Sequence, residues 1–169
     1  ILKMGVLSDI HLNSPGDEST FVKALEYFRD HGADSVLIAG DFADTGRIFQ
    51  AKMLADAWYK VFPNDKLPDG RHVEKLFVYG NHDLEGAGYG YAKRYNLPAE
   101  MFDESHRIVT DRAAAWKKVF GEEWAPIMMK EVKGYRFVLC HELEYPWKGE
   151  NADYLERHRA GLEGQPDTR

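Results

Sequence analysis

The stretch Leu76-Phe77-Val78-Tyr79-Gly80-Asn81-His82-Asp83 decides the fold, because an apolar run leads directly into a turn of ligand-forming side chains. The four apolar residues show no polar alternation, which is typical of a strand covered on both faces. The turn that follows presents an amide, an imidazole and a carboxylate in sequence. A shuffled chain of this composition would contain Gly-Asn-His-Asp in roughly one trial in 700, so the match is specific.

Two earlier stretches repeat this arrangement of an apolar run followed by ligand-forming residues. Residues 4–7 are apolar and lead into Ser8-Asp9-Ile10-His11, and residues 36–39 are apolar and lead into Gly40-Asp41. The sequence therefore predicts three short strands, each with potential ligands at its carboxyl end.

Helices are predicted between these strands. Apolar residues recur at helical spacing from an expected N-cap at Ser19 to a stop at Gly32, and again over about residues 47–61. Strands separated by helices lie parallel in one sheet, so their carboxyl ends meet at one edge. Open α/β sheets bind their ligands at this edge.

The side chains expected at that edge form a mixed oxygen and nitrogen ligand set: Asp9, His11, Asp41, Asn81 and His82. Such a set suits divalent manganese, iron or zinc. Asp41, on the middle strand of the three, could bridge two metal ions. Such a pair of ions stabilises the attacking and the leaving oxygen of an in-line phosphoryl displacement. His82 could protonate the leaving alkoxide, and Asp83 could orient that imidazole or cap the turn. In the simpler alternative, the aspartates only cap helices.

The second half of the chain has a different character. Its patterns predict a helix over residues 111–120, a hairpin over residues 127–139 and a short helix over residues 151–162. In the glycine-rich aromatic stretch before the first of these elements, Tyr89, Tyr91 and Arg94 could line a substrate pocket, in which Arg94 would bind a phosphate. The alternative is an ordinary surface loop.

Composition excludes several classes of protein. The chain has 169 residues, a net charge of −6 and one cysteine, and it is 44% apolar and 30% charged. This is typical of one globular domain and not of a disordered chain. The apolar runs are too short to span a bilayer, and the negative charge disfavours a general nucleic-acid binder. No targeting segment is visible, so the compartment is left open.

The strand-end elements resemble those of the calcineurin-like metallophosphoesterases. The matching elements are Asp9-x-His11, Gly40-Asp41 and Gly80-Asn81-His82-Asp83. The resemblance implies an α/β fold with a β-sheet sandwich flanked by helices. It also implies two divalent metal ions, with Asp9 and His11 on one, Asp41 bridging and Asn81 on the second. His82 would act as an acid or contact the phosphate.

The same resemblance predicts further ligands that this sequence lacks. No Gly-His-x-His element occurs, and a later strand histidine is expected, for which His141 is a possible but superficial match. Asp44 stands where the purple acid phosphatases carry a metal-binding tyrosine, which argues against a tyrosinate-iron site. Residues 1–169 are therefore interpreted as a single metallophosphoesterase domain that stops before its carboxy-terminal His motifs. Such a piece would expose sheet edges and could depend on its missing half or on a second copy.

The leading functional hypothesis is a metal-dependent phosphohydrolase that acts on phosphomonoesters or phosphodiesters of small molecules. One alternative is a nuclease of the same superfamily, which the acidic balance disfavours. The other is a non-catalytic fragment or metal-binding interaction module, which the missing histidines favour.

Overall fold

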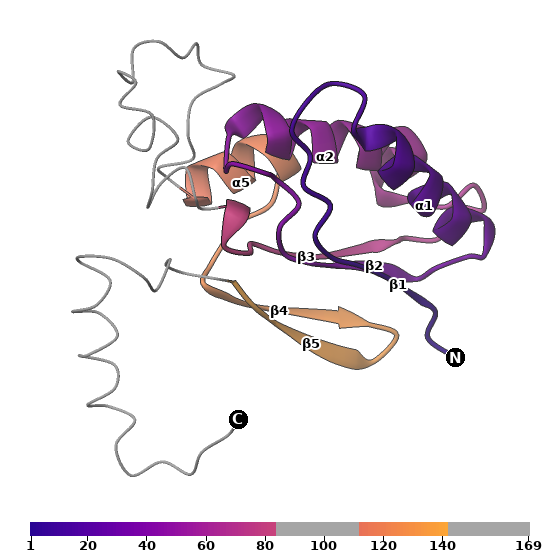
Figure 1. Ribbon diagram of the computed structural model, residues 1–169. Coiled ribbons are helices and arrows are strands. Elements are labelled where there is room, and N and C mark those ends of the chain that lie inside the picture. The colour runs from indigo at the N-terminus through magenta and orange to yellow at the C-terminus, as the bar shows by residue number, and fades with distance from the viewer. Residues whose placement is uncertain (84–111, 142–169) are drawn as a thin grey trace, which may run out of the picture.

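The computed structural model describes residues 1–83 and 112–141 (Figure 1). Its first half alternates strands and helices in the predicted order: β1 (Met4–Leu7), α1 (Glu18–Asp30), β2 (Ser35–Ala39), α2 (Ile48–Val61), the short 3-10 helix η1 (Pro63–Asp65) and β3 (Glu74–Val78). Tyr89, Tyr91, Arg94 and the expected helix at 151–162 lie outside the described residues. No helix in the described ranges combines the length and apolar character that crossing a bilayer requires.

The three strands form one parallel sheet in the order β1-β2-β3. Its register pairs Ala39 with Val78, the last residues of β2 and β3, and Leu7, the last residue of β1, with Ile38, so the three strands end within one residue of one another. The prediction of a parallel sheet with a shared carboxyl edge is confirmed, and the strand that leads into Asp41 is the central one.

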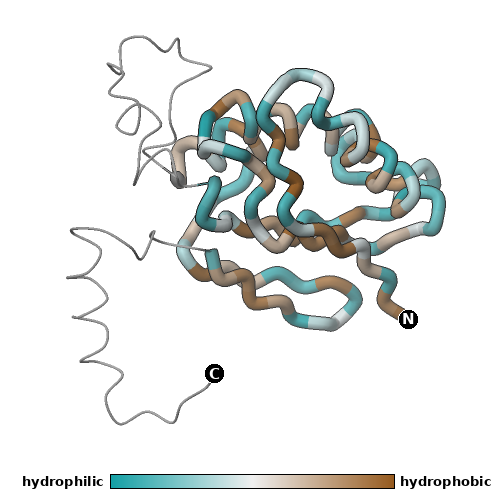
Figure 2. Tube along the Cα trace, in the orientation of Figure 1, coloured by the Kyte–Doolittle hydropathy of each residue, from teal (hydrophilic) through white to brown (hydrophobic). Residues whose placement is uncertain are grey.

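Helices cover one face of this sheet, and a hairpin covers part of the other (Figure 1). On the helix side, α1, α2 and α5 (Arg112–Phe120) enclose a core in which the Trp58 ring lies edge-on to Phe77, 5.2 Å between centroids. Figure 2 shows hydrophobic residues concentrated along the central strands. The burial of these apolar side chains is the main favourable term in the fold.

The hairpin consists of β4 (Ile127–Val132) and β5 (Tyr135–Cys140), which pair antiparallel. Lys133 and Gly134 join the strands with φ angles of 51° and 81°, the two positive values that a tight primed hairpin turn requires. Val132 and Leu139 are buried against Leu76 of β3. The predicted hairpin and the mixed α/β architecture, with one parallel sheet, one antiparallel sheet and flanking helices, are thus both confirmed.

The start of α1 differs from the prediction. Ser19 lies inside the helix, and Asp17 occupies the N-cap position. The Asp17 carboxylate accepts hydrogen bonds from the backbone N–H groups of Asn13 and Ser14, at 3.0 and 2.7 Å, so it stabilises the preceding loop. The predicted N-cap at Ser19 was wrong, because a carboxylate two residues earlier orders the loop that leads into the helix. Gly32 follows the helix with a φ of 67°, as expected of a helix stop.

A network of partly buried ion pairs joins the layers. The Lys75 side chain on β3 is 4% exposed, and its Nζ lies 2.5 Å from Asp65 and 3.1 Å from Glu122. Lys130 on β4 contacts Glu74 and Glu122, both at 2.9 Å, and donates a hydrogen bond to the carbonyl oxygen of Lys75. The network raises the pKa of Lys75 and lowers that of Glu74, although burial opposes both shifts.

Replacing Lys75 with methionine is expected to lower the free energy of unfolding by about 3 kcal/mol, because Asp65 and Glu122 lose their shared cation in a partly buried setting. The matched control is Lys52→Met on α2, whose ion pair with Asp56 is about two-thirds exposed. That change should cost less than about 0.5 kcal/mol. Urea unfolding of both variants provides the comparison, and equal losses of unfolding free energy would contradict a stabilising role for this partly buried network.

Candidate metal centre

The turns after β1 and β2 run side by side at the carboxyl edge of the sheet. The backbone N–H of Asp9 donates to the carbonyl of Gly40 at 3.2 Å, and that of His11 donates to the carbonyl of Asp41 at 3.0 Å. Leu12 and Ala43 then form a parallel bridge. The ladder of the sheet therefore extends into the turns and holds the predicted ligands next to one another.

Three of the predicted ligands have left-handed backbone conformations. The φ angles are 54° at Asp9, 49° at His11 and 53° at Asp41. Residues other than glycine rarely adopt this region, and such strain concentrates at functional sites. The N-cap positions of α1 and α2 are Asp17 and Arg47, so Asp9 and Asp41 do not serve as ordinary helix caps.

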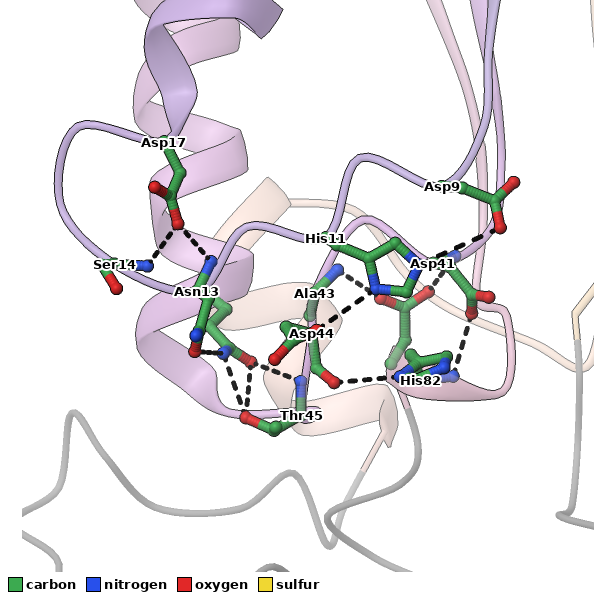
Figure 3. Close-up of polar contacts among 12 residues, drawn as sticks. Asp9, His11, Asn13, Ser14, Asp17, Asp41, Ala43, Asp44, Thr45 and His82 are labelled. Atoms are coloured by element: carbon green, nitrogen blue, oxygen red, sulfur yellow. Dashed lines mark hydrogen bonds and ion pairs between the residues drawn. The ribbon is translucent and has the colours of Figure 1, made fainter.

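Asp9, His11 and Asp41 form a compact donor set (Figure 3). Each residue offers one ligand atom, and these atoms lie within 4.8 Å of one another. His11 Nε2 lies 4.0 Å from Asp9 Oδ1, and Asp41 Oδ1 accepts a hydrogen bond from the His82 backbone N–H at 2.9 Å. Two carboxylates and an imidazole fit manganese, iron or zinc, so the residues present suit a divalent ion.

The glycines of the two turns allow this close approach. A Cβ atom at Gly80 would lie 2.6 Å from the backbone nitrogen of Asp41 and closer still to its carboxylate. A Cβ atom at Gly40 would lie 2.8 Å from the Cα of Gly80. Side chains at either position would therefore push apart the turns that carry Asp41 and His82.

Asp83 holds the same two turns together. Its side chain is 1% exposed. One carboxylate oxygen accepts backbone N–H groups from Gly80 at 2.8 Å and Asp41 at 2.9 Å, and the other accepts the N–H of Ala43 at 2.7 Å. Burial raises the pKa of Asp83 to about 8, against the opposing effect of these donors. The contacts fit the turn-capping interpretation of Asp83 better than a role in orienting the His82 imidazole.

Asn81 and His82 lie partly exposed in the turn after β3. His82 Nδ1 lies 3.0 Å from the backbone carbonyl of Asp44, which can only accept, so this nitrogen carries a proton. The His82 ring stands edge-on to His11, with 4.6 Å between centroids. The structure thus brings the imidazole predicted to act in catalysis next to the predicted ligands.

A family model described as calcineurin-like phosphoesterase matches residues 2–161. The chain belongs to this family. Membership indicates a hydrolase that acts on phosphoesters and uses divalent metal ions, in agreement with the donor set at the sheet edge. No curated protein matches the chain at a significant level.

Within this phosphoesterase, sequence reasoning missed the role of Gln50. Its side chain is fully buried, and its Oε1 accepts the backbone N–H groups of Thr45 and Arg47, both at 3.1 Å. Its Nε2 donates to Thr45 Oγ1 at 3.0 Å and to Asn13 Oδ1 at 3.4 Å. Gln50 therefore joins the turns that follow His11 and Asp41. The sequence feature that could have indicated this role is the position of Gln50, one helical turn before the apolar residue Leu54 and therefore on the buried face of the predicted helix.

His141 is engaged elsewhere. It is buried among Tyr79, Trp116 and Trp124, and its Nδ1 accepts the backbone N–H of Tyr79 at 3.0 Å. Neither of the two donor groups found in the described residues includes it. Its contacts are those of a core histidine that holds the end of β5 against β3, and they do not point to metal ligation.

This environment should make the protein acid-sensitive. Burial, and secondarily the charge of Lys130, lowers the pKa of His141 to about 4. Between pH 6.5 and 4, His141 binds a proton in the unfolded chain but not in the folded chain. The contribution of neutral His141 to the free energy of unfolding is therefore fully present above pH 6.5 and is lost as the pH falls. At pH 5 the free energy of unfolding is lower by about 2 kcal/mol for this reason.

A His141→Asn variant keeps an acceptor for the Tyr79 N–H but does not titrate. Its free energy of unfolding should fall less between pH 7.5 and pH 5 than that of the unmodified chain, as measured by urea unfolding. An unchanged pH dependence would show that His141 does not cause the acid sensitivity.

Proposed function

We propose that the protein hydrolyses phosphomonoesters or phosphodiesters of small molecules at a dinuclear metal centre. The observation that carries this proposal is the convergence of Asp9, His11 and Asp41 to within 4.8 Å at the carboxyl edge of the sheet, in a member of a phosphoesterase family. Asp9 and His11 would hold one ion, Asn81 would hold the second, and Asp41 would lie between them.

The bound ions would lower the pKa of water, so that hydroxide is available at neutral pH, and would offset charge on the phosphoryl oxygens. The chain's own contribution is to keep the donors in place. Asp41 is held by the His82 N–H, and His11 by the hydrogen bond of its backbone N–H to the Asp41 carbonyl. Because Asp44 stands where a tyrosine would be needed, manganese, zinc or iron without a tyrosinate ligand is proposed.

His82 is proposed to act on the leaving group. Its Nδ1 proton is donated to the carbonyl of Asp44, which fixes the orientation of the ring. Nε2 is then the atom that would donate a proton to the leaving alkoxide or a hydrogen bond to a phosphoryl oxygen. Asp83 would contribute indirectly, by holding together the turns that carry Asp41 and His82.

The test combines metal stoichiometry with turnover of the purified chain in the presence of manganese. The expected result is two bound ions and hydrolysis of p-nitrophenyl phosphate or bis(p-nitrophenyl) phosphate. Cleavage of DNA in preference to both chromogenic esters would favour the nuclease alternative. One ion or none, with no turnover of any substrate, would overturn the proposal and favour a metal-binding interaction module.

A further inference from the structure

Asp44 contacts both of the turns that carry imidazoles. Its backbone N–H donates to the carbonyl of Leu12 at 3.2 Å, and its own carbonyl accepts the Nδ1 proton of His82 at 3.0 Å. Its carboxylate oxygen lies 3.3 Å from Nδ1 of His11 (Figure 3). A single residue of the β2 turn therefore adjoins Nδ1 of both histidines.

The two nitrogens of His11 face different carboxylates. Nδ1 faces Asp44 at 3.3 Å, and Nε2 faces Asp9 at 4.0 Å. A neutral imidazole carries one proton, so only one of its nitrogens can offer a lone pair to a metal ion. A hydrogen-bond acceptor beside one ring nitrogen keeps the proton on that nitrogen, and the opposite nitrogen is then the one that can bind a metal ion.

We propose that Asp44 is a positioning residue that keeps the proton of His11 on Nδ1. Nε2 is thereby presented as a metal ligand on the side of Asp9 and Asp41. The inference rests on the proposed function, because it assigns His11 to the metal centre. It deepens that function by identifying the group that sets the tautomer of the ligand.

A competing arrangement uses Asp44 as a ligand. Asp44, His11 and His82 also offer atoms within 4.8 Å of one another. An ion bound there through His11 Nδ1 would require the proton on Nε2, so the same imidazole could not also serve Asp9 and Asp41. The group with Asp9 and Asp41 supplies two carboxylates against one, which favours it for a divalent cation.

The decisive measurement is the tautomer of His11, read from the ¹⁵N shifts of its ring nitrogens in the metal-free chain, at a pH where the ring is neutral. The expected state is Nδ1–H in the unmodified chain and a shift toward Nε2–H in Asp44→Ala. Asp44→Asn keeps an acceptor oxygen and should retain much of the Nδ1–H form. His82 is an internal reference, because its acceptor is a backbone carbonyl that these substitutions preserve. The control Asp56→Ala removes an exposed carboxylate of α2 and should change neither ring.

Manganese binding provides the second readout. Asp44→Ala should weaken the affinity by about tenfold without changing the number of ions bound, as expected when the partner of a ligand histidine is lost. His11 in the Nε2–H form in the unmodified chain, or the loss of one whole ion in the variant, would overturn the proposal. An unmodified chain with His11 in the Nδ1–H form but no manganese binding would instead count against the proposed function. The ¹⁵N shifts still decide the role of Asp44 in that case and in a variant that unfolds more easily.

Discussion

An Asp41→Asn variant should lose at least about 10³-fold in phosphoester turnover while remaining folded. Asparagine tolerates the left-handed conformation that Asp41 adopts, with φ at 53°, and its amide oxygen can still accept the N–H of His82. The substitution removes the negative charge proposed to lie between two cations. Such charge stabilisation contributes several kcal/mol to a transition state, and 4 kcal/mol corresponds to roughly a thousandfold in rate.

The measurements are kcat/KM with bis(p-nitrophenyl) phosphate, the manganese stoichiometry and the urea midpoint of the same preparation. Asp56→Asn is the control, because its carboxylate is exposed and pairs only with Lys52 among the described residues. We expect the unfolding free energy of Asp41→Asn to lie within about 1 kcal/mol of the unmodified chain. Full activity in this variant would refute the proposed mechanism.

Replacing Asp83 with alanine should have the largest effect on stability, about 4 kcal/mol or more. The substitution leaves one buried and two partly buried backbone N–H groups without their acceptor, and an unsatisfied buried N–H costs about 1–3 kcal/mol. Asp83→Asn should also be costly, because an amide that replaces one oxygen points an N–H group at another N–H group. Urea unfolding of both variants measures these losses.

Asp17→Ala is the matched control for this prediction. Asp17 also accepts two backbone N–H groups through its carboxylate, but it is exposed, so water replaces the lost acceptor. Loss of these two exposed hydrogen bonds should lower the free energy of unfolding by about 1 kcal/mol. If Asp83→Ala were no more destabilising than Asp17→Ala, the carboxylate of Asp83 would not be holding the two turns together.

Both predictions concern one feature of the molecule, the contact between the turns after β2 and β3. Asp41 is 42 positions from Asp83 in sequence, yet its N–H binds the Asp83 carboxylate, and its own carboxylate binds the His82 N–H. Because of this reciprocal pairing, the hydrogen bonds that stabilise the fold also hold Asp41 and His82 in place in the candidate site. Loosening the turn at Asp83 is therefore also expected to displace His82.

Sequence patterns were sufficient for the strands, their parallel order and the hairpin. An apolar run followed by glycine, or a Lys-Gly pair between two β-rich runs, is a local signal whose meaning depends little on distant residues. The start of α1 was less predictable. Ser19 and Asp17 are both good N-cap residues, and the hydrogen bonds of Asp17 to the preceding loop are visible only once that loop is folded.

The sequence by itself determined which chemical groups follow each strand: carboxylates after β1 and β2, an amide and an imidazole after β3. These groups then share one edge, because the three strands pair in parallel and so end on the same side of the sheet. Only the tertiary structure decided which group faces which. It placed Asp44 against His11, buried Asp83 beneath three backbone N–H groups, and turned His141 toward Tyr79. Such pairings join segments far apart in the chain, and a sequence records the residue types present but not the partners that folding assigns to them.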